Sequence, residues 1–379
     1  MSSKQLTSLF ISSLTIWIAG NGLLPLLPVY AQLLGADETI SGLYLAFAYL
    51  AITLGALSAG KVAGNRFGRK RPLMLVTLAT SPLAWLIGQV RSLWALILLT
   101  ALLWFGGGLA LALINIITGV SAGEHERGKI FGTLALASAL GSVIGGLGTG
   151  WLVNAWGYTT MFKVLAGFML LGPLSVLFIN EKVDNKPQTE AENLEESKPL
   201  GRHYWLLFTA SVTISILGFF NLLARSISMN DMGFDPFEIS STIVIGGLIS
   251  LPLPYLLGSL SDRIERKIVL ILGYLSAIAA VILLAISNRL WQFWVVSILQ
   301  GTAAGSSTAI GKAYVTDLVS NASFDRGLAV FGTTTWIGGI IGFAVTGFML
   351  QNLGFVVSCF LGAGIGVAAL VLLLPIHSS

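Results

Sequence analysis

The sequence is poor in charge and in cysteine. Only 10% of its 379 residues are Asp, Glu, Lys or Arg, whereas 55% are hydrophobic and the mean hydropathy is +0.85. An ordinary soluble domain carries about 25% charged residues. Its single cysteine, Cys359, excludes an intramolecular disulfide, and no spacing of Cys and His suggests a metal site. The composition therefore excludes a soluble domain and predicts a membrane protein that needs no metal or other cofactor.

The sequence gives little support for a hydrolytic enzyme. H-E-x-x-H does not occur and no acids are paired inside an apolar run, and the one match to G-x-S-x-G, at 119–123, lies at the end of a long apolar run and not between a strand and a helix. A membrane-embedded enzyme is therefore disfavoured. The chain is basic, with a formal net charge of +4, which in a soluble protein would point to nucleic acid. In a membrane protein the positions of the basic residues decide instead, and no nucleic-acid partner is expected.

Long apolar runs recur along the whole chain. Each spans about 20 residues or more, which is enough for a helix to cross about 30 Å of hydrocarbon. The first run follows Lys4, is too long for a signal peptide and lacks a clear cleavage site. We predict an all-α membrane protein with twelve transmembrane helices, at 6–34, 39–64, 71–90, 93–121, 128–156, 158–180, 203–228, 237–260, 268–287, 290–318, 327–353 and 355–376.

The basic residues are distributed asymmetrically across this topology. Of the 21 lysines and arginines, five fall outside or within the membrane, namely Arg91, Lys163, Arg225, Arg289 and Lys312. The others lie in loops on the side that carries both termini. The positive-inside rule places that side in the cytoplasm, where a basic face would lie against anionic lipid. We therefore expect a multi-pass protein of the plasma or inner membrane with both termini cytoplasmic.

The chain divides into two related halves. A polar, acidic segment from Asn180 to Arg202 separates them, so the predicted organisation is 1–180, a linker at 181–202, and 203–379. The halves resemble each other at an offset near 197 residues: "RSLW" matches "NRLW", and "GNRFGRKRPLML" matches "SDRIERKIVLIL". Duplicated six-helix units with a substrate site at the midplane between them are a recurrent plan of transporters.

Two motifs carry a more specific resemblance. "KVAGNRFGRK", with the weaker copy "GSLSDRIERK", is similar to the loop motif G-x-x-x-D-R-x-G-R-[RK] of the major facilitator superfamily, and a glycine series matches the helix 5 signature of its drug:proton antiporters. The resemblance spans the whole chain and implies that the two halves rock around a central cavity. The residues that it assigns to gating are Asn65, Arg66, Gly68, Arg69, Lys70, Gly258, Asp262, Arg263, Arg266, Asp317, Gly132, Gly141, Gly145 and Gly150.

The resemblance implies an ionic latch at the inner rim. Asp262 would cap the N-terminus of the fifth predicted helix (128–156), which lies in the first half, because the unpaired N–H groups there favour an anion. Arg266 or Arg263 would pair with Asp317, so that the cluster holds the two halves together. Asn65 stands where the family has Asp, so we expect a gate whose stronger latch lies in the second half. The alternative interpretation is that these basic loops only set the topology.

Ionisable groups are scarce inside the predicted spans. No carboxylate or histidine lies mid-membrane, and Leu103 and Trp104 stand where these antiporters carry an arginine on helix 4. Proton coupling is therefore an open question. The candidates for lining a cavity are amide, basic and aromatic: Asn21, Asn115, Asn221, Arg225, Gln300, Lys312, Tyr49, Trp104 and Trp336.

Each of these candidates has a structural alternative. Amides can instead join helices, Arg225 and Lys312 can extend to headgroups, and the aromatic rings can pack or face lipid. Glycine pairs such as Gly141 and Gly145 let helices approach closely whether or not the helices move.

We expect a secondary transporter that exports a small amphipathic or neutral organic compound by alternating access, because the cavity candidates are not acidic. The alternatives are a sugar or metabolite carrier of the same fold and, from another class, a transport-inactive receptor. The expected partners are the substrate, membrane lipid and a coupling ion such as the proton, and the expected form is a monomer.

Overall fold

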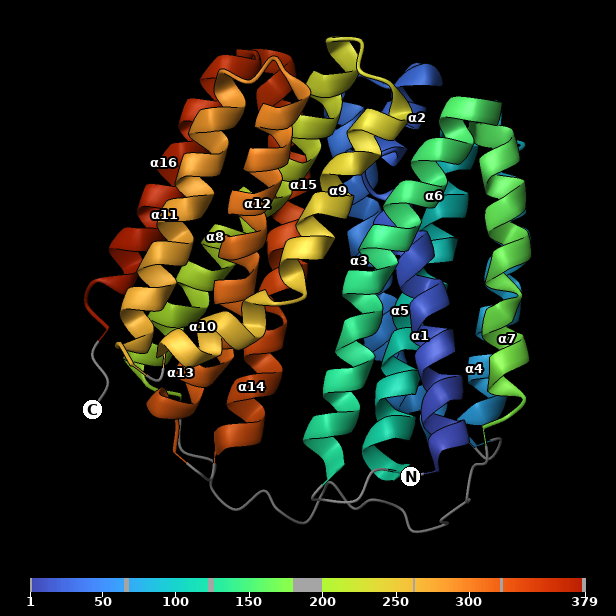
Figure 1. The fold of residues 1–379 in the computed structure, drawn as a ribbon, viewed down its shortest axis with the longest axis horizontal. Helices are drawn as coiled ribbons and strands as arrows, with labels where there is room; N and C mark the ends of the chain where they lie inside the picture. The colour runs from blue at the N-terminus through green and yellow to red at the C-terminus, as the bar shows by residue number, and fades with distance from the viewer. Residues whose placement is uncertain are drawn as a thin grey trace.

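The computed structural model describes residues 2–64, 68–121, 126–179, 200–261, 263–320 and 323–376, and the regular elements among them are helices. The helices run side by side, and the chain begins and ends toward the same end of the molecule (Figure 1). We call this the termini end, at the bottom of Figure 1, and the opposite end the far end. The prediction of an all-helical membrane protein is confirmed.

The helices of the first half have the following bounds: α1 (Ser3–Leu23), α2 (Leu27–Leu33), α3 (Glu38–Ala63), α4 (Lys70–Ile87), α5 (Leu93–Ser121), α6 (Arg127–Met169) and α7 (Leu171–Val176). Those of the second half are α8 (Arg202–Asp231), α9 (Pro236–Ser250), α10 (Leu253–Ser261), α11 (Arg266–Ala285), α12 (Leu290–Gly305), a π-helical segment (Ser306–Ile310), α13 (Gly311–Leu318), α14 (Phe324–Gly332), α15 (Thr334–Leu353) and α16 (Phe355–Leu373).

Helices therefore occupy all twelve predicted spans. Eight stretches of described helix are long and apolar enough to cross a membrane, or nine if the bent pair α9 and α10 counts as one span. One stretch contains two helical arms, because Gly157 in α6 adopts φ 78° and ψ 171°, a conformation that favours glycine, and the chain reverses there. Gly354 makes the equivalent turn between α15 and α16, with φ 77° and ψ 165°.

Several spans are broken where the sequence predicted continuous helix. The first span ends as α1 near Pro25 and resumes as α2. The eighth bends by 46° between α9 and α10, where Pro252 and Pro254 cannot donate backbone hydrogen bonds. The tenth passes through the π-helical segment, and the eleventh is interrupted at Thr333. Amphipathic and apolar patterns identify a span but do not show these interruptions.

The sequence repeat has a counterpart in hydrogen bonding. The Lys70 ammonium donates to the backbone oxygen of Leu177 at 2.8 Å, and the Lys267 ammonium donates to that of Leu374 at 2.7 Å. Both pairs join the start of one helix to the end of another, and the two are 197 residues apart. Each lysine satisfies a carbonyl that a helix terminus leaves without an intrahelical partner.

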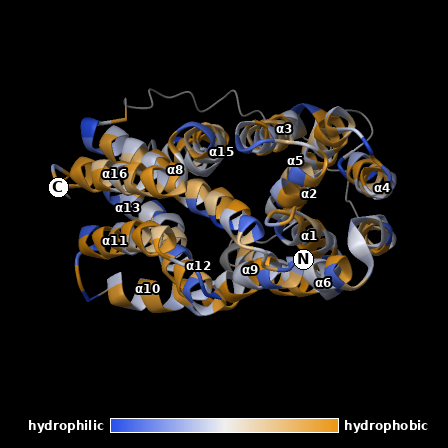
Figure 2. Cartoon of the chain, turned by 90° about the horizontal axis from the view of Figure 1, so that it is seen from above, coloured by the Kyte–Doolittle hydropathy of each residue, from blue (hydrophilic) through white to orange (hydrophobic). Residues whose placement is uncertain are grey.

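The two halves meet along two seams. α3 lies beside α15 and α6 lies beside α9 (Figures 1 and 2). A Cβ added at Gly42 in α3 would lie 2.5 Å from the backbone oxygen of Phe343 in α15, and one at Gly150 in α6 would lie 2.7 Å from the Ser240 Cβ in α9. Glycine allows this approach because larger residues would hold the backbones apart.

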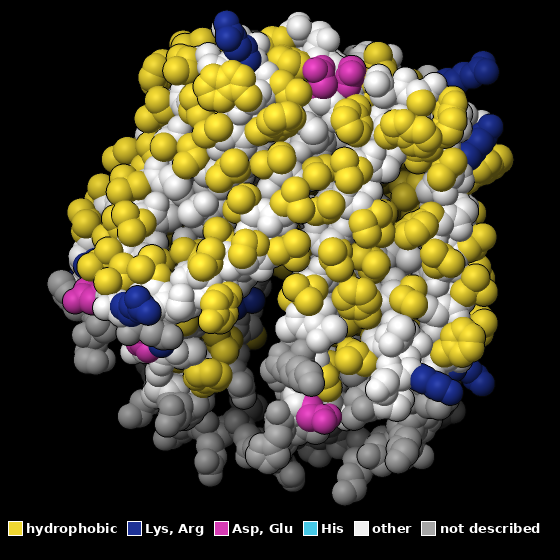
Figure 3. Space-filling model, in the orientation of Figure 1, with side chains coloured by type: hydrophobic (Ala, Val, Ile, Leu, Met, Phe, Trp, Pro, Cys, Tyr) yellow, Lys and Arg dark blue, Asp and Glu magenta, His cyan; other side chains and the backbone are white. Residues whose placement is uncertain are grey.

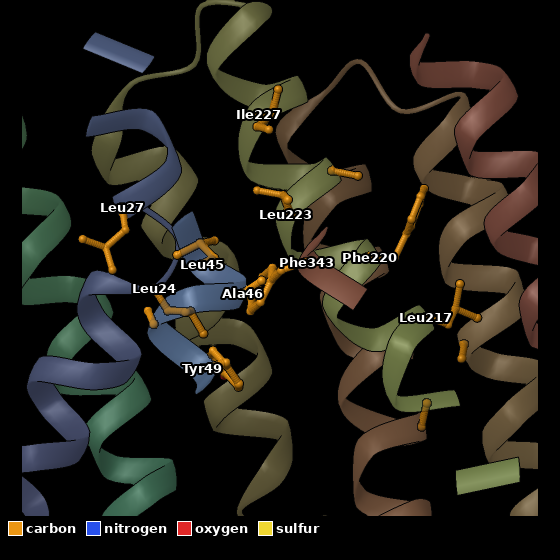
Figure 4. Close-up of a cluster of buried hydrophobic side chains, with 14 of the residues drawn as sticks. Leu24, Leu27, Leu45, Ala46, Tyr49, Leu217, Phe220, Leu223, Ile227 and Phe343 are labelled. Atoms are coloured by element: carbon orange, nitrogen blue, oxygen red, sulfur yellow. The ribbon is translucent and has the colours of Figure 1, made fainter. Parts of the chain in front are cut away.

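Hydrophobic residues cover most of the visible outer face, and the charged side chains on it gather near the two ends (Figure 3). This distribution is expected of a surface that lies in hydrocarbon. Inside, a buried cluster joins the halves toward the far end: Leu24, Leu45 and Tyr49 face Phe343 and the helix that carries Leu223 (Figure 4).

Candidate functional site

Two adjoining cavities lie between the halves. The aromatic cavity, about 340 Å³, is lined mainly by the first half and includes Trp17, Asn21, Tyr49, Trp104, Thr335 and Trp336. The polar cavity, about 270 Å³, is lined mainly by the second half and includes Arg225, Thr242, Ser297, Gln300, Ser307 and Thr335. Because Thr335 in α15 lines both, the two adjoin and form one candidate site.

Tyr49 is the centre of the aromatic cavity's wall. Its ring lies 5.5 Å from that of Trp104 and 6.3 Å from that of Trp336, measured between centroids. It also contacts Phe219 edge-on at 4.8 Å and Phe343 at 5.1 Å. Such tilted and edge-to-face contacts are favourable arrangements for aromatic rings. The predicted residues Tyr49, Trp104 and Trp336 thus come together, and the cluster links α3 and α5 to α8 and α15.

Arg225 is the most buried charge of the polar cavity. Its side chain comes from α8, and the residue is 4% exposed. Its Nη1 donates to the Ser297 hydroxyl at 2.7 Å and, at a longer 3.5 Å, to the Asn221 side-chain oxygen. Its Nε is buried without a hydrogen-bond partner. Arg225 therefore lines the cavity and does not extend to the membrane surface.

The predicted amides near Arg225 behave differently from each other. Gln300 lines the polar cavity and its side-chain oxygen is buried without a partner. Asn221 is fully buried beside Arg225 and is absent from the linings of both cavities. Asn221 therefore does not line either cavity directly. It contacts Arg225, which lies one helical turn further along α8.

Asn21 satisfies both interpretations offered for it. It lines the aromatic cavity, and its amide nitrogen donates to the Ser138 backbone oxygen at 3.1 Å and to the Ser142 hydroxyl at 2.8 Å. The side chain therefore joins α1 to α6.

Asn115 and Lys312 are exposed and belong to neither lining. Each follows a lining residue, Leu111 or Thr308, by four positions. Asn115 and Lys312 therefore lie on the same helix faces as these lining residues, one turn nearer to the termini end.

The predicted ion pair of Asp317 is present, and its partner is Arg266. The Nη1 of Arg266 donates to the carboxylate at 2.7 Å and to the backbone oxygen of Ala313. The pair joins α11 to α13, both in the second half, so by itself it does not bridge the halves. Arg263 lies exposed in the turn before α11. Asn65, Arg66 and Asp262 lie outside the described residues.

The glycines of the predicted motifs fall into three groups. Gly141 and Gly145 pack against α1 within the first half, whereas Gly150 packs against α9 across a seam. Gly132 and Gly258 have open space where a side chain would lie. Gly68 has φ 69° and precedes Arg69 and the first turn of α4, which explains a glycine at that motif position.

Several lining residues were missed by the sequence reasoning. Trp17, Ser142, Phe219, Ser297 and Thr335 line a cavity but were not singled out. A signal existed in two stripes of small and polar residues at helical spacing: 242, 246 and 250 on α9, and 297, 301, 304 and 308 on α12 and the π-helical segment. The period marks one helix face, but only the fold shows that this face lines a cavity.

The halves are joined at the far end and separated by a cleft toward the termini end. At the far end, Asn230 donates to Gln32 at 3.1 Å and the Glu38 backbone donates to Gln351 at 3.2 Å, both between the halves. Toward the termini end, the space-filling view shows a cleft between the halves (Figure 3). The aromatic cluster around Tyr49 lies between the cavity and the closed seams.

Comparisons with solved structures show the same fold. The chain aligns with a structure of the nucleoside transporter NupG with a TM-score of 0.78 and 18% identity, covering 99% of both chains. It aligns with a POT family transporter in complex with a thioalcohol conjugated peptide with a TM-score of 0.77 and 15% identity, covering 97% of this chain and 94% of the other.

Sequence comparisons identify the family. The chain is 27% identical to multidrug resistance protein MdtG of Klebsiella pneumoniae (strain 342), over 88% of this chain and 83% of that protein. It is also 27% identical to MdtG of Enterobacter lignolyticus (strain SCF1), over 93% and 87%. The Major Facilitator Superfamily model matches residues 9–286 and 205–379. With the fold and the central cavity, these matches show that the chain is a membrane transporter, not an enzyme, and that it belongs to the Major Facilitator Superfamily.

Proposed function

We propose that this transporter exports a small amphipathic organic compound by alternating access. The observation that carries the proposal is the two-part cavity between the halves, with aromatic rings on one side and polar groups on the other. Such a site would take an apolar body and a polar head together. The distant relatives named multidrug resistance proteins support export.

We further propose that the termini end faces the cytoplasm, because the basic residues concentrate in its loops. The structure would then correspond to a state that loads substrate from inside. The halves 1–180 and 203–379 would rock as units, opening the glycine-lined seams at the far end. The rim near Arg266 and Asp317 would close in the other state, and Asp262 would contribute to it.

Coupling to protons has little support from the cavity itself. Among the described residues, neither cavity is lined by Asp, Glu or His. A proton-coupled cycle would need a titrating group elsewhere, for example at the rim.

The test is substrate flux in proteoliposomes of the purified protein. A panel of fluorescent amphipathic compounds is loaded, and efflux is followed with and without a pH gradient. Trp104→Ala should reduce flux, because Trp104 lines the cavity. Trp94→Ala is the matched control, because Trp94 is 77% exposed on the same helix. Absence of flux for the whole panel, with binding retained, would favour the receptor alternative, and flux of sugars alone would favour the metabolite carrier.

A further inference from the structure

Arg225 is a buried cation surrounded by neutral groups. Among the described residues its side chain hydrogen-bonds only to Ser297 and Asn221, and its Nε has no partner. The ion pair between described residues joins Arg266 and Asp317 at the rim, so no described carboxylate neutralises Arg225. A charge in the membrane interior is costly unless it is paired, and such residues normally mark a substrate pathway.

The fold does not require a cation at this place. The residue at the corresponding position of the first half, 198 residues earlier, is Leu27, which is buried in the apolar core. The same offset of 198 relates Trp17 of α1 to Ser215 of α8. These two residues pack on Gly141 and Gly338, which are 197 residues apart. The first half therefore buries an apolar residue at this offset, at the start of α2 and just after the break that α8 lacks.

The surroundings of Arg225 are suited to an anion. The guanidinium lines the polar cavity, and Asn221 beside it has a buried amide nitrogen without a partner. The cavity lining adds the Ser297 and Thr242 hydroxyls. Among the described residues, no Asp or Glu lines either cavity to repel a negative charge. Guanidinium groups bind carboxylates and phosphonates through charge-assisted hydrogen bonds.

We propose that the substrate is an amphipathic organic anion. Its negatively charged head would bind Arg225 in the polar cavity, and its apolar body would lie in the aromatic cavity against Trp104 and Trp336. Thr335 lines both cavities, so one molecule of moderate size can occupy both. This inference rests on the proposed transport function, of which it specifies the substrate class.

The experiment compares three probes that share one ring system: 1-naphthylacetate, its uncharged amide and 1-naphthylethylammonium. Binding to the purified full-length protein is measured by equilibrium dialysis at constant ionic strength. We expect the anion to bind about ten- to a hundredfold more tightly than the amide, because hydrogen bonds to charged groups are the stronger kind, and the cation to bind most weakly.

Variants then locate the effect. Arg225→Gln should remove the preference for the anion over the amide, and Arg225→Lys should retain part of it. Arg91→Gln is the matched control, because it also removes one positive charge but from an exposed turn, and it should leave the preference unchanged. If Arg225→Gln does not fold, the order of the three probes on the unaltered protein still decides.

The outcomes separate this inference from the transport function. Equal binding of anion and amide, preference for the cation, or a preference that survives Arg225→Gln would overturn the inference. If the protein nevertheless transports neutral or cationic dyes in proteoliposomes, the transport function stands without it. If the anion binds through Arg225 but no compound is moved, the anion site stands and the transport function fails.

Discussion

The two halves share their glycine turns, their helix contacts and the lysines that bind helix-terminal carbonyls. They nevertheless line the cavity with side chains of different types. The helix caps Asp37 and Asp235 set an offset of 198 residues between α3 and α9, which places Gly247 where the first half has Tyr49. The offset of 197 between "RSLW" and "NRLW" likewise makes Gly301 the residue of the second half that is equivalent to Trp104 of the first half. The first half therefore fills its side of the cavity with rings, and the second half leaves room for polar groups.

The seams show the same exchange of large and small residues. Tyr49 packs onto Gly339 of α15, whereas Gly247 accommodates Ser142 of α6. The contact is retained by exchanging which helix carries the larger side chain. The two halves thus keep the helices equally close, although the side chains that they present to the cavity differ.

The halves also differ in the regularity of their backbones. α3 and α5 of the first half are continuous. Their counterparts are the bent pair α9 and α10, and α12 followed by the π-helical segment. Proline and π-turns are recognised causes of such interruptions. α9 and the π-helical segment both line the polar cavity, so the backbone irregularities of the second half border the polar site.

The largest expected effect comes from removing the central ring of the first half. Tyr49→Ala should lower the free energy of unfolding by about 3 kcal/mol, because truncation of a buried aromatic residue leaves a cavity and four ring contacts are lost. Thermal unfolding of the purified protein measures the change. Trp94→Ala should leave stability nearly unchanged, because Trp94 is exposed. Equal losses in the two variants would show that the Tyr49 cluster does not hold the halves together.

A smaller effect should distinguish the two seams. Gly42→Ala should destabilise by about 1–3 kcal/mol, the usual cost of overpacking, because its Cβ would meet the backbone of α15, which cannot yield locally. Gly146→Ala should cost less, because its nearest neighbours are side-chain methyl groups of Ile243 and Val244 at 2.7 Å.

Gly60→Ala is the baseline for these two variants. Gly60 lies in α3 with nothing within 4 Å of an added Cβ, so this change should stabilise slightly through helix propensity. Thermal unfolding of the three variants side by side gives the order. A Gly146 variant less stable than the Gly42 variant would reverse the comparison and make α6 and α9 the tighter seam.

Much of the fold could be predicted from the sequence because it depends on one-dimensional patterns. Apolar length identified the spans, and the gaps that it left at positions 157 and 354, which are 197 residues apart, fall at the two glycine turns. The family resemblance implied an ion pair of Asp317 with Arg266 or Arg263, and the structure shows that the partner is Arg266. These features are set by residues close in sequence or by a repeated register.

The composition of the site was less predictable, because it depends on which helix faces meet. Arg225, Asn221 and Gln300 all stood out as polar residues in apolar helices, but only the packing of α8 against α12 separates a lining residue from a buried one. The bend at Pro252 could have been expected from its chemistry. The two parts of the cavity could not, since no single segment contains either.

The smallest expected effect on stability concerns the ion pair of Asp317 and Arg266 at the rim of the second half. Asp317→Asn should change the free energy of unfolding by less than about 1 kcal/mol, because the side chains of Asp317 and Arg266 are 36% and 34% exposed and exposed pairs contribute little. The buried Thr118, near the matching position of the first half, donates only to its own helix, at the Ile114 backbone oxygen.

The conformational effect of the same change should be larger than its effect on stability. If the rim closes through the second half, Asp317→Asn should increase the time spent open at the termini end. A cysteine at position 308, introduced as Thr308→Cys with Cys359→Ala, would then be alkylated faster, because Thr308 lines the polar cavity and is exposed to it. Thr118→Val should leave the rate unchanged. If the cysteine at position 308 were alkylated equally fast with and without Asp317→Asn, the ion pair would only hold α11 against α13. The second half would then have no special role in gating.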